Sequence, residues 1–313
     1  MAKKSNNTSL AFQKFKKTIE SEIRYYWQVT TSIIYTERWW SNIKIEDWPV
    51  RLSEYANDKV NPFNSIDIPV NEYLRYNNQI KNVTVENSIV SFITSFEVYL
   101  LDVTRRIIFL NPEIIDDSSM PFEAKDIACG LTKHNAREWF SNRVASNYMR
   151  NKTHLKMLKW MESLAKIDLF KTHKSIVEEW NKWTYVRNAI VHSGREVTED
   201  LAKIWPEKFS TVNANLNLTD KDVVRVHYLA IEIAKKIDSR IIETTIKDED
   251  GFLLIKELFV RFGYENVSEI SQKIYKILNH KLGKMVVEQQ LAKQKKNNSE
   301  IEGWFFSHYN FEE

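Results

Sequence analysis

The segment from about 83 to 110 carries the pattern that most restricts the fold of this chain. Its apolar residues recur at steps of three and four, which places them on one face of a helix. They are Ile89, Phe92, Ile93, Phe96, Leu100, Val103, Ile107 and Leu110. Asn111-Pro112 follows, and because the residue before a proline is pushed out of the α region, we expect the helix to end there. The pattern predicts one long amphipathic helix at the centre of the fold.

The scarcity of glycine and proline extends this prediction to the whole chain. Each occurs only six times in 313 residues, against an ordinary usage of roughly 7% and 5%. Turns between strands consume glycine, so an all-β or α/β chain of this length would need more of it. Hydrophobic residues make up 43% of the chain, which is typical of a globular protein. We therefore predict an all-α fold.

Further helices are expected along the chain wherever apolar residues recur at helical spacing. The expected ranges are 10–36, 122–131, 135–152, 154–169, 173–193, 198–204, 220–245 and most of 252–313. Three of the six prolines lie between 49 and 70, which predicts an irregular segment there. The sequence from Asp248 to Gly251 is expected to form a turn, and Thr198 is a candidate N-cap.

Charge and cysteine content exclude several classes of protein. The net charge is +3, which by itself does not identify a nucleic-acid binder. The single cysteine, Cys129, excludes an intrachain disulfide and a cysteine-based zinc site, and it fits a reducing cytoplasm. The segment from Met1 to Gln13 has no apolar core, and no run of 18 apolar residues occurs. We therefore expect a cytoplasmic protein without a secretory signal or a membrane span.

The candidate catalytic residues lie in the sequence from Trp183 to Gly194, where polar residues interrupt an apolar helix. Asn188 and His192 are four residues apart, so they lie one above the other on one face. Arg187 lies about 140° around the helix from His192, and its long side chain can bend back towards that face. Gly194 directly follows the helix, where a left-handed residue is expected.

These residue types suit cleavage of an RNA phosphodiester by its own 2′-hydroxyl. A histidine can transfer a proton near neutral pH, and a guanidinium stabilises the charge that develops on the phosphorane. A side-chain amide such as that of Asn188 can hold the phosphate or orient the arginine. Because the substrate carries its own nucleophile, the reaction requires no metal and no cofactor.

An arginine, a polar residue and a histidine in this order, near the end of a late helix, resemble the signature of the HEPN superfamily. The sequences Ser95-Phe96-Glu97, Leu101-Asp102, Arg105-Arg106-Ile107 and Asn111-Pro112-Glu113 look like the long early helix of RiboL-PSP-type members. The similar region covers about 80–245. It leaves 1–79 as a mostly helical N-terminal extension and 246–313 as a helical C-terminal extension.

The resemblance implies a HEPN-type helical bundle that forms a homodimer, with two copies of the Arg187 and His192 pair in one RNA-cleaving cleft. It also implies a metal-independent endoribonuclease that acts as a toxin or an anti-phage effector, with an antitoxin or a phage-derived trigger as a possible partner. Some HEPN toxins carry a tyrosine two residues after the histidine, which a partner nucleotidyltransferase modifies. Gly194 occupies that position here, so we do not expect that regulation.

Four further residues are weaker candidates. Glu97 and Asp102 either orient the catalytic groups or are ordinary paired helix residues, and Arg195 either binds phosphate or is a surface arginine. Trp183 lies one turn before Arg187 and could stack on an unpaired base, although most tryptophans belong to a core. The other histidines lack metal-ligand spacing. The alternative function is a non-catalytic scaffold of the HEPN fold that binds RNA or protein.

Overall fold

The computed structural model describes residues 7–55, 66–115, 136–149 and 152–296, together with Lys125, Ala128 and Gly130. Within these residues the chain is all-helical, as the sequence predicts, and extended segments pair only at an isolated bridge between Glu196 and Asn215. Lys125, Ala128 and Gly130 are helical, and the rest of the helix expected at 122–131, Cys129 included, lies outside the described residues.

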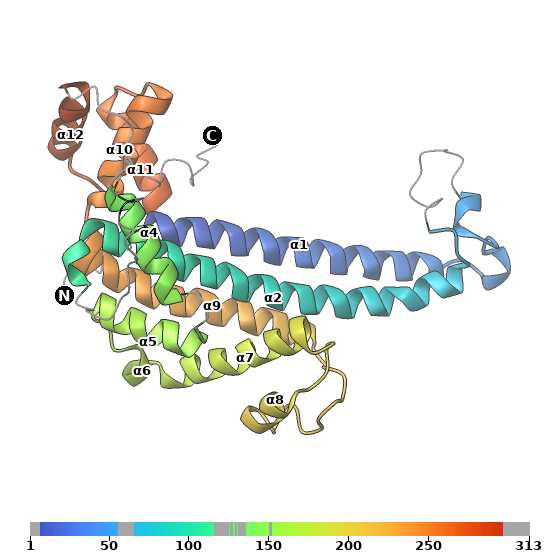
Figure 1. Cartoon of the computed structure of the whole chain (residues 1–313). Coiled ribbons are helices and arrows are strands. Elements are labelled where there is room, and N and C mark those ends of the chain that lie inside the picture. Colours follow the sequence, from blue (N-terminus) through green and yellow to red (C-terminus); the bar gives the residue numbers. More distant parts are fainter. Residues whose placement is uncertain are drawn as a thin grey trace. The chain divides into compact units, whose positions relative to one another are not determined.

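The helices of the described part are labelled in chain order in Figure 1. They are α1 (Leu10–Ser41), α2 (Val70–Leu110), α4 (Ala136–Met149), α5 (His154–Ala165), α6 (Leu169–Thr172), α7 (Lys174–His192), α8 (Glu199–Ile204), α9 (Asp220–Ile241), α10 (Glu249–Phe262), α11 (Val267–Leu278) and α12 (Lys284–Lys296). Short 3₁₀ turns occur at Ile45–Asp47, Leu52–Tyr55 and Pro112–Ile114, and a π-helical turn occurs at Ile242–Ile246.

The chain divides into two compact units. Unit 1 comprises Met1–Thr18, Thr94–Asn181 and Leu229–Glu313, and unit 2 comprises Ile19–Ile93 and Lys182–Tyr228. The helices α1, α2, α7 and α9 contribute residues to both. Each unit therefore combines segments far apart in the sequence, whereas the division predicted above is into three consecutive segments.

The C-terminal part of unit 1 is a cluster of α10, α11 and α12. Its buried residues are Leu10, Leu254, Ile255, Leu258, Ile270, Ile274, Leu278, Val287 and Leu291. The turn predicted at Asp248–Gly251 is wrong, because α10 already begins at Glu249. A Cβ atom on Gly251 would lie 2.9 Å from Leu282. The glycine therefore permits close packing within the helical cluster, and it does not mark a chain reversal.

The start of α1 in unit 1 is held by two buried carboxylates. The backbone N–H and the hydroxyl of Ser9 both donate to Asp238, and Ser9 Oγ caps the helix by accepting from the Phe12 N–H at 3.1 Å. The N–H of Leu10 donates to Asp250 at 2.9 Å, and Arg106 Nε donates to the same carboxylate at 2.7 Å. The first N–H groups of a helix lack partners within the helix, so these carboxylates satisfy them.

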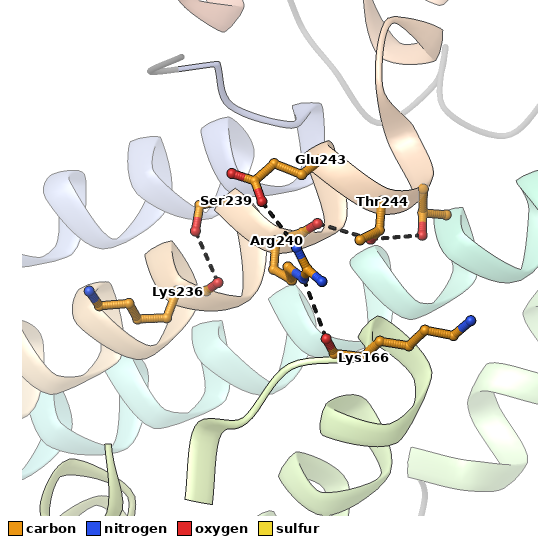
Figure 2. A network of polar contacts seen from close by, with 7 residues as sticks. Lys166, Lys236, Ser239, Arg240, Glu243 and Thr244 are labelled. Carbon is orange, nitrogen blue, oxygen red and sulfur yellow. Dashed lines mark hydrogen bonds and ion pairs between the residues drawn. The ribbon is translucent and has the colours of Figure 1, made fainter. Parts of the chain in front are cut away.

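A second polar contact in unit 1 joins the end of α5 to the junction between α9 and the π-helical turn. Figure 2 shows Arg240 between the backbone carbonyl of Lys166, at 3.4 Å from its Nε, and the carboxylate of Glu243, at 3.3 Å from its Nη1. The hydroxyl of Thr244 donates to the carbonyl of Arg240 at 2.9 Å. Two of these bonds satisfy backbone carbonyls, that of Lys166 just after α5 and that of Arg240 just before the π-helical turn.

Unit 2 contains a small core of Trp40, Leu52 and Val70, against which Ile43, Trp48, Ile68, Tyr73 and Leu74 pack. This core explains why α2 begins at Val70 and not near 83, where the sequence predicted its start. The first three turns of α2 are rich in asparagine and glutamine, so their helical period is weak in the sequence. The apolar contacts with Trp40 stabilise those turns in the fold.

Candidate functional site

The helix α7 places the three candidate catalytic residues at its C-terminal end, in unit 2. Its buried side chains in this unit are Trp183, Thr184, Val186 and Ala189, so the helix turns this face towards the core. Asn188 and His192 are exposed and Arg187 is half-buried. Gly194 follows with a φ of +65°, the left-handed conformation that commonly ends a helix, and a Cβ atom added to it would meet no atom within 4 Å. The exposed end of α7 therefore presents the polar residues to solvent.

Arg187, Asn188 and His192 are brought together by a shared guanidinium nitrogen. Arg187 Nη1 donates to Asn188 Oδ1 at 3.2 Å and lies 3.4 Å from His192 Nε2. A guanidinium has only donors, so this second contact is a hydrogen bond when His192 Nε2 is unprotonated and Nδ1 carries the proton. The distance of 3.4 Å makes it a long one. The arrangement leaves a basic ring nitrogen beside a fixed positive charge.

Arg195 lies in the turn that follows α7 and is tied to α2. Its Nε is 3.0 Å from Glu86 Oε2, and the arginine side chain is 50% exposed, so its outer part can still meet a ligand. Burial raises the pKa of Glu86, and the charge of Arg195 opposes that shift. Arg195 has a φ of +69°, a left-handed conformation that costs a non-glycine residue about 1 kcal/mol. The ion pair with Glu86 holds this turn together with two backbone hydrogen bonds. The N–H of Arg195 donates to the carbonyl of Ala189, and the carbonyl of Arg195 accepts from the N–H of Leu216.

Trp183 belongs to a buried aromatic cluster with Trp205 and Phe209. It is 1% exposed, and its ring meets that of Trp205 edge-on at 4.9 Å. Lys208 Nζ lies 4.9 Å from the Trp183 ring and 5.3 Å from the Trp205 ring, and it is also paired with Asp222. In this conformation Trp183 therefore supports the helix that carries the motif, and its ring faces are not open to a base.

Glu97 and Asp102, the two candidate supporting carboxylates, lie in unit 1 with partners of their own. Glu97 Oε1 is 2.6 Å from Nε2 of His154, and Trp180 Nε1 donates to His154 Nδ1 at 3.2 Å. Because the indole N–H can only donate, Nε2 of His154 carries the proton and donates to Glu97. Asp102 accepts from Lys14 Nζ at 2.7 Å and lies 3.6 Å from Arg105. Both carboxylates therefore stabilise unit 1.

Sequence reasoning missed Glu86 and His154 as partners of candidate residues. Glu86 lies seven residues before Ile93 and three before Ile89, so it occupies a position of the apolar stripe of α2. A carboxylate at such a position needs a cation, and that is the signal that could have identified it. His154 carries no comparable signal, because its partners Glu97 and Trp180 are far from it in the sequence.

Within the described residues, no group of three or more histidine, cysteine or acidic side chains is placed to hold a metal ion. No helix of that part of the chain is long and apolar enough to cross a membrane. Comparisons with protein-family models, with curated proteins and with solved structures found no match to this chain.

Proposed function

We propose that this chain is a cytoplasmic, metal-independent endoribonuclease of the HEPN type whose reacting groups are Arg187, Asn188 and His192. The observation that supports the proposal is the position of Arg187 Nη1, which lies 3.2 Å from Asn188 Oδ1 and 3.4 Å from His192 Nε2 at the exposed end of α7. Attack of a 2′-hydroxyl on its phosphodiester needs a group that transfers protons and groups that stabilise the charge on the phosphate. An imidazole, a guanidinium and an amide that lie close together can provide these.

In the proposed reaction, His192 Nε2 takes the proton of the 2′-hydroxyl, and the 2′-oxygen forms a bond to phosphorus. The bond from phosphorus to the 5′-oxygen breaks, and an imidazolium returns one proton to that oxygen. The products are a 2′,3′-cyclic phosphate and a 5′-hydroxyl. Arg187 donates to the non-bridging oxygens as charge develops on them, and Asn188 positions the phosphate with its amide.

The contact between Arg187 and His192 also has a role in this scheme. In the free chain the guanidinium occupies the lone pair of Nε2, so the base is held and not yet available. A phosphate oxygen is a stronger acceptor for the guanidinium than a neutral ring nitrogen. Binding of the phosphodiester to Arg187 would release Nε2 for proton transfer.

A homodimer is part of the proposal because the site is open in the single chain. His192 and Asn188 are exposed, whereas charge stabilisation is strongest in a site from which water is excluded. A second copy of the motif would enclose the phosphodiester and provide a second imidazole. Control by an antitoxin or by a phage-derived trigger is a further element of the same proposal.

The test is cleavage of single-stranded RNA by the purified full-length protein in EDTA, with the product ends identified. We expect 2′,3′-cyclic phosphate ends from the wild type, and a loss in rate of about 100-fold or more in His192→Ala and Arg187→Ala. His173→Ala, which changes a half-buried histidine outside the site, is the matched control and should cleave normally. Strict dependence on magnesium, or equal activity in His192→Ala, would exclude the proposal.

The second candidate function is a non-catalytic scaffold that binds RNA or a protein partner, and the same openness of His192 favours it. A scaffold predicts that the folded dimeric wild type cleaves none of a varied set of RNAs. It also predicts that His192→Ala keeps its biological function while changes of surface arginines abolish it.

A further inference from the structure

The segment of α1 in unit 2 has one face turned inward and one turned to solvent. Ile19, Tyr26, Ile33 and Trp40 are buried on the inner face. On the same side, both oxygens of Glu37 accept from Lys81 Nζ of α2, at 2.8 and 2.9 Å. The opposite face carries most of the exposed side chains of this segment.

The exposed residues between Ser21 and Ser41 have an unusual composition. Four carry aromatic rings, with exposures of 65% for Tyr25, 42% for Trp27, 74% for Tyr35 and 45% for Trp39. Two are arginines, and the remaining exposed residues are uncharged. They are Ser21, Arg24, Tyr25, Trp27, Gln28, Thr31, Ser32, Ile34, Tyr35, Arg38, Trp39 and Ser41. No carboxylate is exposed between Ser21 and Ser41, because Glu22 and Glu37 are half-buried.

The two arginines and the ring of Tyr35 lie in one row along the helix. Arg24, Gln28, Thr31, Tyr35 and Arg38 follow one another at steps of three and four, so they share one stripe. With a rise of about 1.5 Å per residue, the two arginines are roughly 21 Å apart along the helix. Neither makes an ion pair with any residue of the described part of the chain.

The ring of Trp39 is held in place from beneath. It meets the buried ring of Trp40 edge-on, with 4.5 Å between the ring centres, while almost half of its own surface stays exposed. Such a ring loses little conformational freedom when a planar ligand stacks on it.

We propose that this outward face of α1, from Arg24 to Trp39, binds single-stranded RNA. Exposed aromatic rings stack on unpaired bases, and arginines between them contact phosphates. Between Ser21 and Ser41 no exposed carboxylate repels a polyanion, and the exposed Glu20 lies one turn before Arg24, outside this face. The inference goes beyond the proposed cleavage, because the face would bind RNA whether or not the motif at the end of α7 reacts.

The experiment measures binding of a fluorescent RNA of about 12 nucleotides with a 2′-O-methyl group on every ribose. This probe lacks the 2′-hydroxyl nucleophile, so binding is measured without cleavage. Fluorescence anisotropy of the full-length protein in EDTA gives the Kd at several salt concentrations. The experiment therefore distinguishes a protein that does not cleave RNA from a protein whose α1 face does not bind RNA.

We expect Tyr35→Ala and Trp39→Ala each to weaken binding at least about fivefold, since stacking on one base is lost. Trp39→Phe, which keeps a ring, should retain most of the affinity and shows that the fold is intact. Arg24→Gln with Arg38→Gln should lower the slope of log Kd against log salt by about 1.4, because two phosphate contacts are removed.

Matched controls change similar residues on unit 1. Tyr275→Ala removes a ring that is 46% exposed, and Lys235→Gln with Lys236→Gln removes two exposed charges from α9. Neither should alter the Kd as strongly as the α1 variants do.

Three results would overturn the proposal. The first is a wild type that does not bind the probe, and the second is a set of controls that weaken binding as much as the α1 variants do. In the third, the α1 variants change the mass measured by light scattering and leave the Kd unchanged, which would make the face a protein interface.

Discussion

Replacement of Arg106 by methionine tests how the start of α1 is held in unit 1. Arg106 and Asp250 are each 4% exposed, and Nε of the arginine donates to the carboxylate at 2.7 Å. Asp250 also accepts from the backbone N–H of Leu10 at 2.9 Å. Methionine fills a similar volume without a charge, so the variant leaves a buried carboxylate with the Leu10 N–H but without its cation.

Breaking a buried ion pair from one side costs about 3 to 5 kcal/mol, because one charge stays buried and uncompensated. A domain has about 5 to 15 kcal/mol of unfolding free energy in total. We therefore expect Arg106→Met to lower the free energy of unfolding by about 3 kcal/mol or more. Asp250→Asn should cost a similar amount, because it leaves the buried charge of Arg106 without its carboxylate even though the amide oxygen can still accept from Leu10.

A double-mutant cycle separates the free energy of the ion pair from the free energy lost through poorer packing. If the pair is the cause, Arg106→Met with Asp250→Asn should cost at least about 1 kcal/mol less than the two single changes added. Urea unfolding gives the three free energies, and hydrogen exchange at the Leu10 amide reports the start of α1. Additivity within about 0.5 kcal/mol would refute the argument.

The control cycle uses an ion pair on the surface. Lys174 and Glu178 are 73% and 59% exposed and lie 3.7 Å apart on α7. The coupling between Lys174→Met and Glu178→Gln should be about 0.5 kcal/mol or less.

Three further predictions concern single side chains. Burial raises the pKa of Asp238 to about 7, so its neutral form stabilises the fold at low pH, and this contribution is lost as pH rises through about 7. The unfolding free energy of the wild type should therefore fall relative to that of Asp238→Asn by about 2 to 3 kcal/mol between pH 5 and 8; an equal pH profile in the two proteins would contradict this. Lys247 has φ +48° and ψ −117°, so Lys247→Gly should raise the melting temperature, while Lys235→Gly within α9 should lower it. Thr198 Oγ1 accepts from the Leu201 N–H at 3.1 Å, so Thr198→Ala should cost about 1 kcal/mol and speed hydrogen exchange at Leu201.

The helices that could be predicted are those with a strong local signal. The C-terminal two-thirds of α2 were predicted correctly. The signals were the apolar stripe that includes Phe96 and Val103 and the helix end at Asn111-Pro112. The cap at Thr198 and the left-handed Gly194 are confirmed, because their signals involve residues one turn away. The start of α2 at Val70 was missed, since its stabilisation comes from Trp40, which is remote in the sequence.

The candidate site likewise has features that follow from one segment of sequence and features that depend on remote residues. The proximity of Asn188 and His192 follows from the period of one helix, and the reach of Arg187 follows from the length of its side chain. The pairs of Arg195 with Glu86 and of Glu97 with His154 depend on contacts between helices. No spacing within a single segment contains that information, so sequence reasoning could name the residues without naming their partners.

The geometry of α7 also limits what one chain can do with this motif. Side chains at positions i and i+4 of a helix point outward beside each other, so they offer one wall and cannot surround a phosphate. Arg187 offers only part of its guanidinium to a ligand. Its Nη1 reaches Asn188 and His192, whereas its Nε is buried and has no hydrogen-bond partner in the described structure. A phosphodiester bound to Nη1 would keep its far side in water, where charge stabilisation is weak. The proposed cleavage therefore requires a second element that encloses the phosphate, and in the proposed homodimer a second copy of α7 would supply that wall and another proton donor.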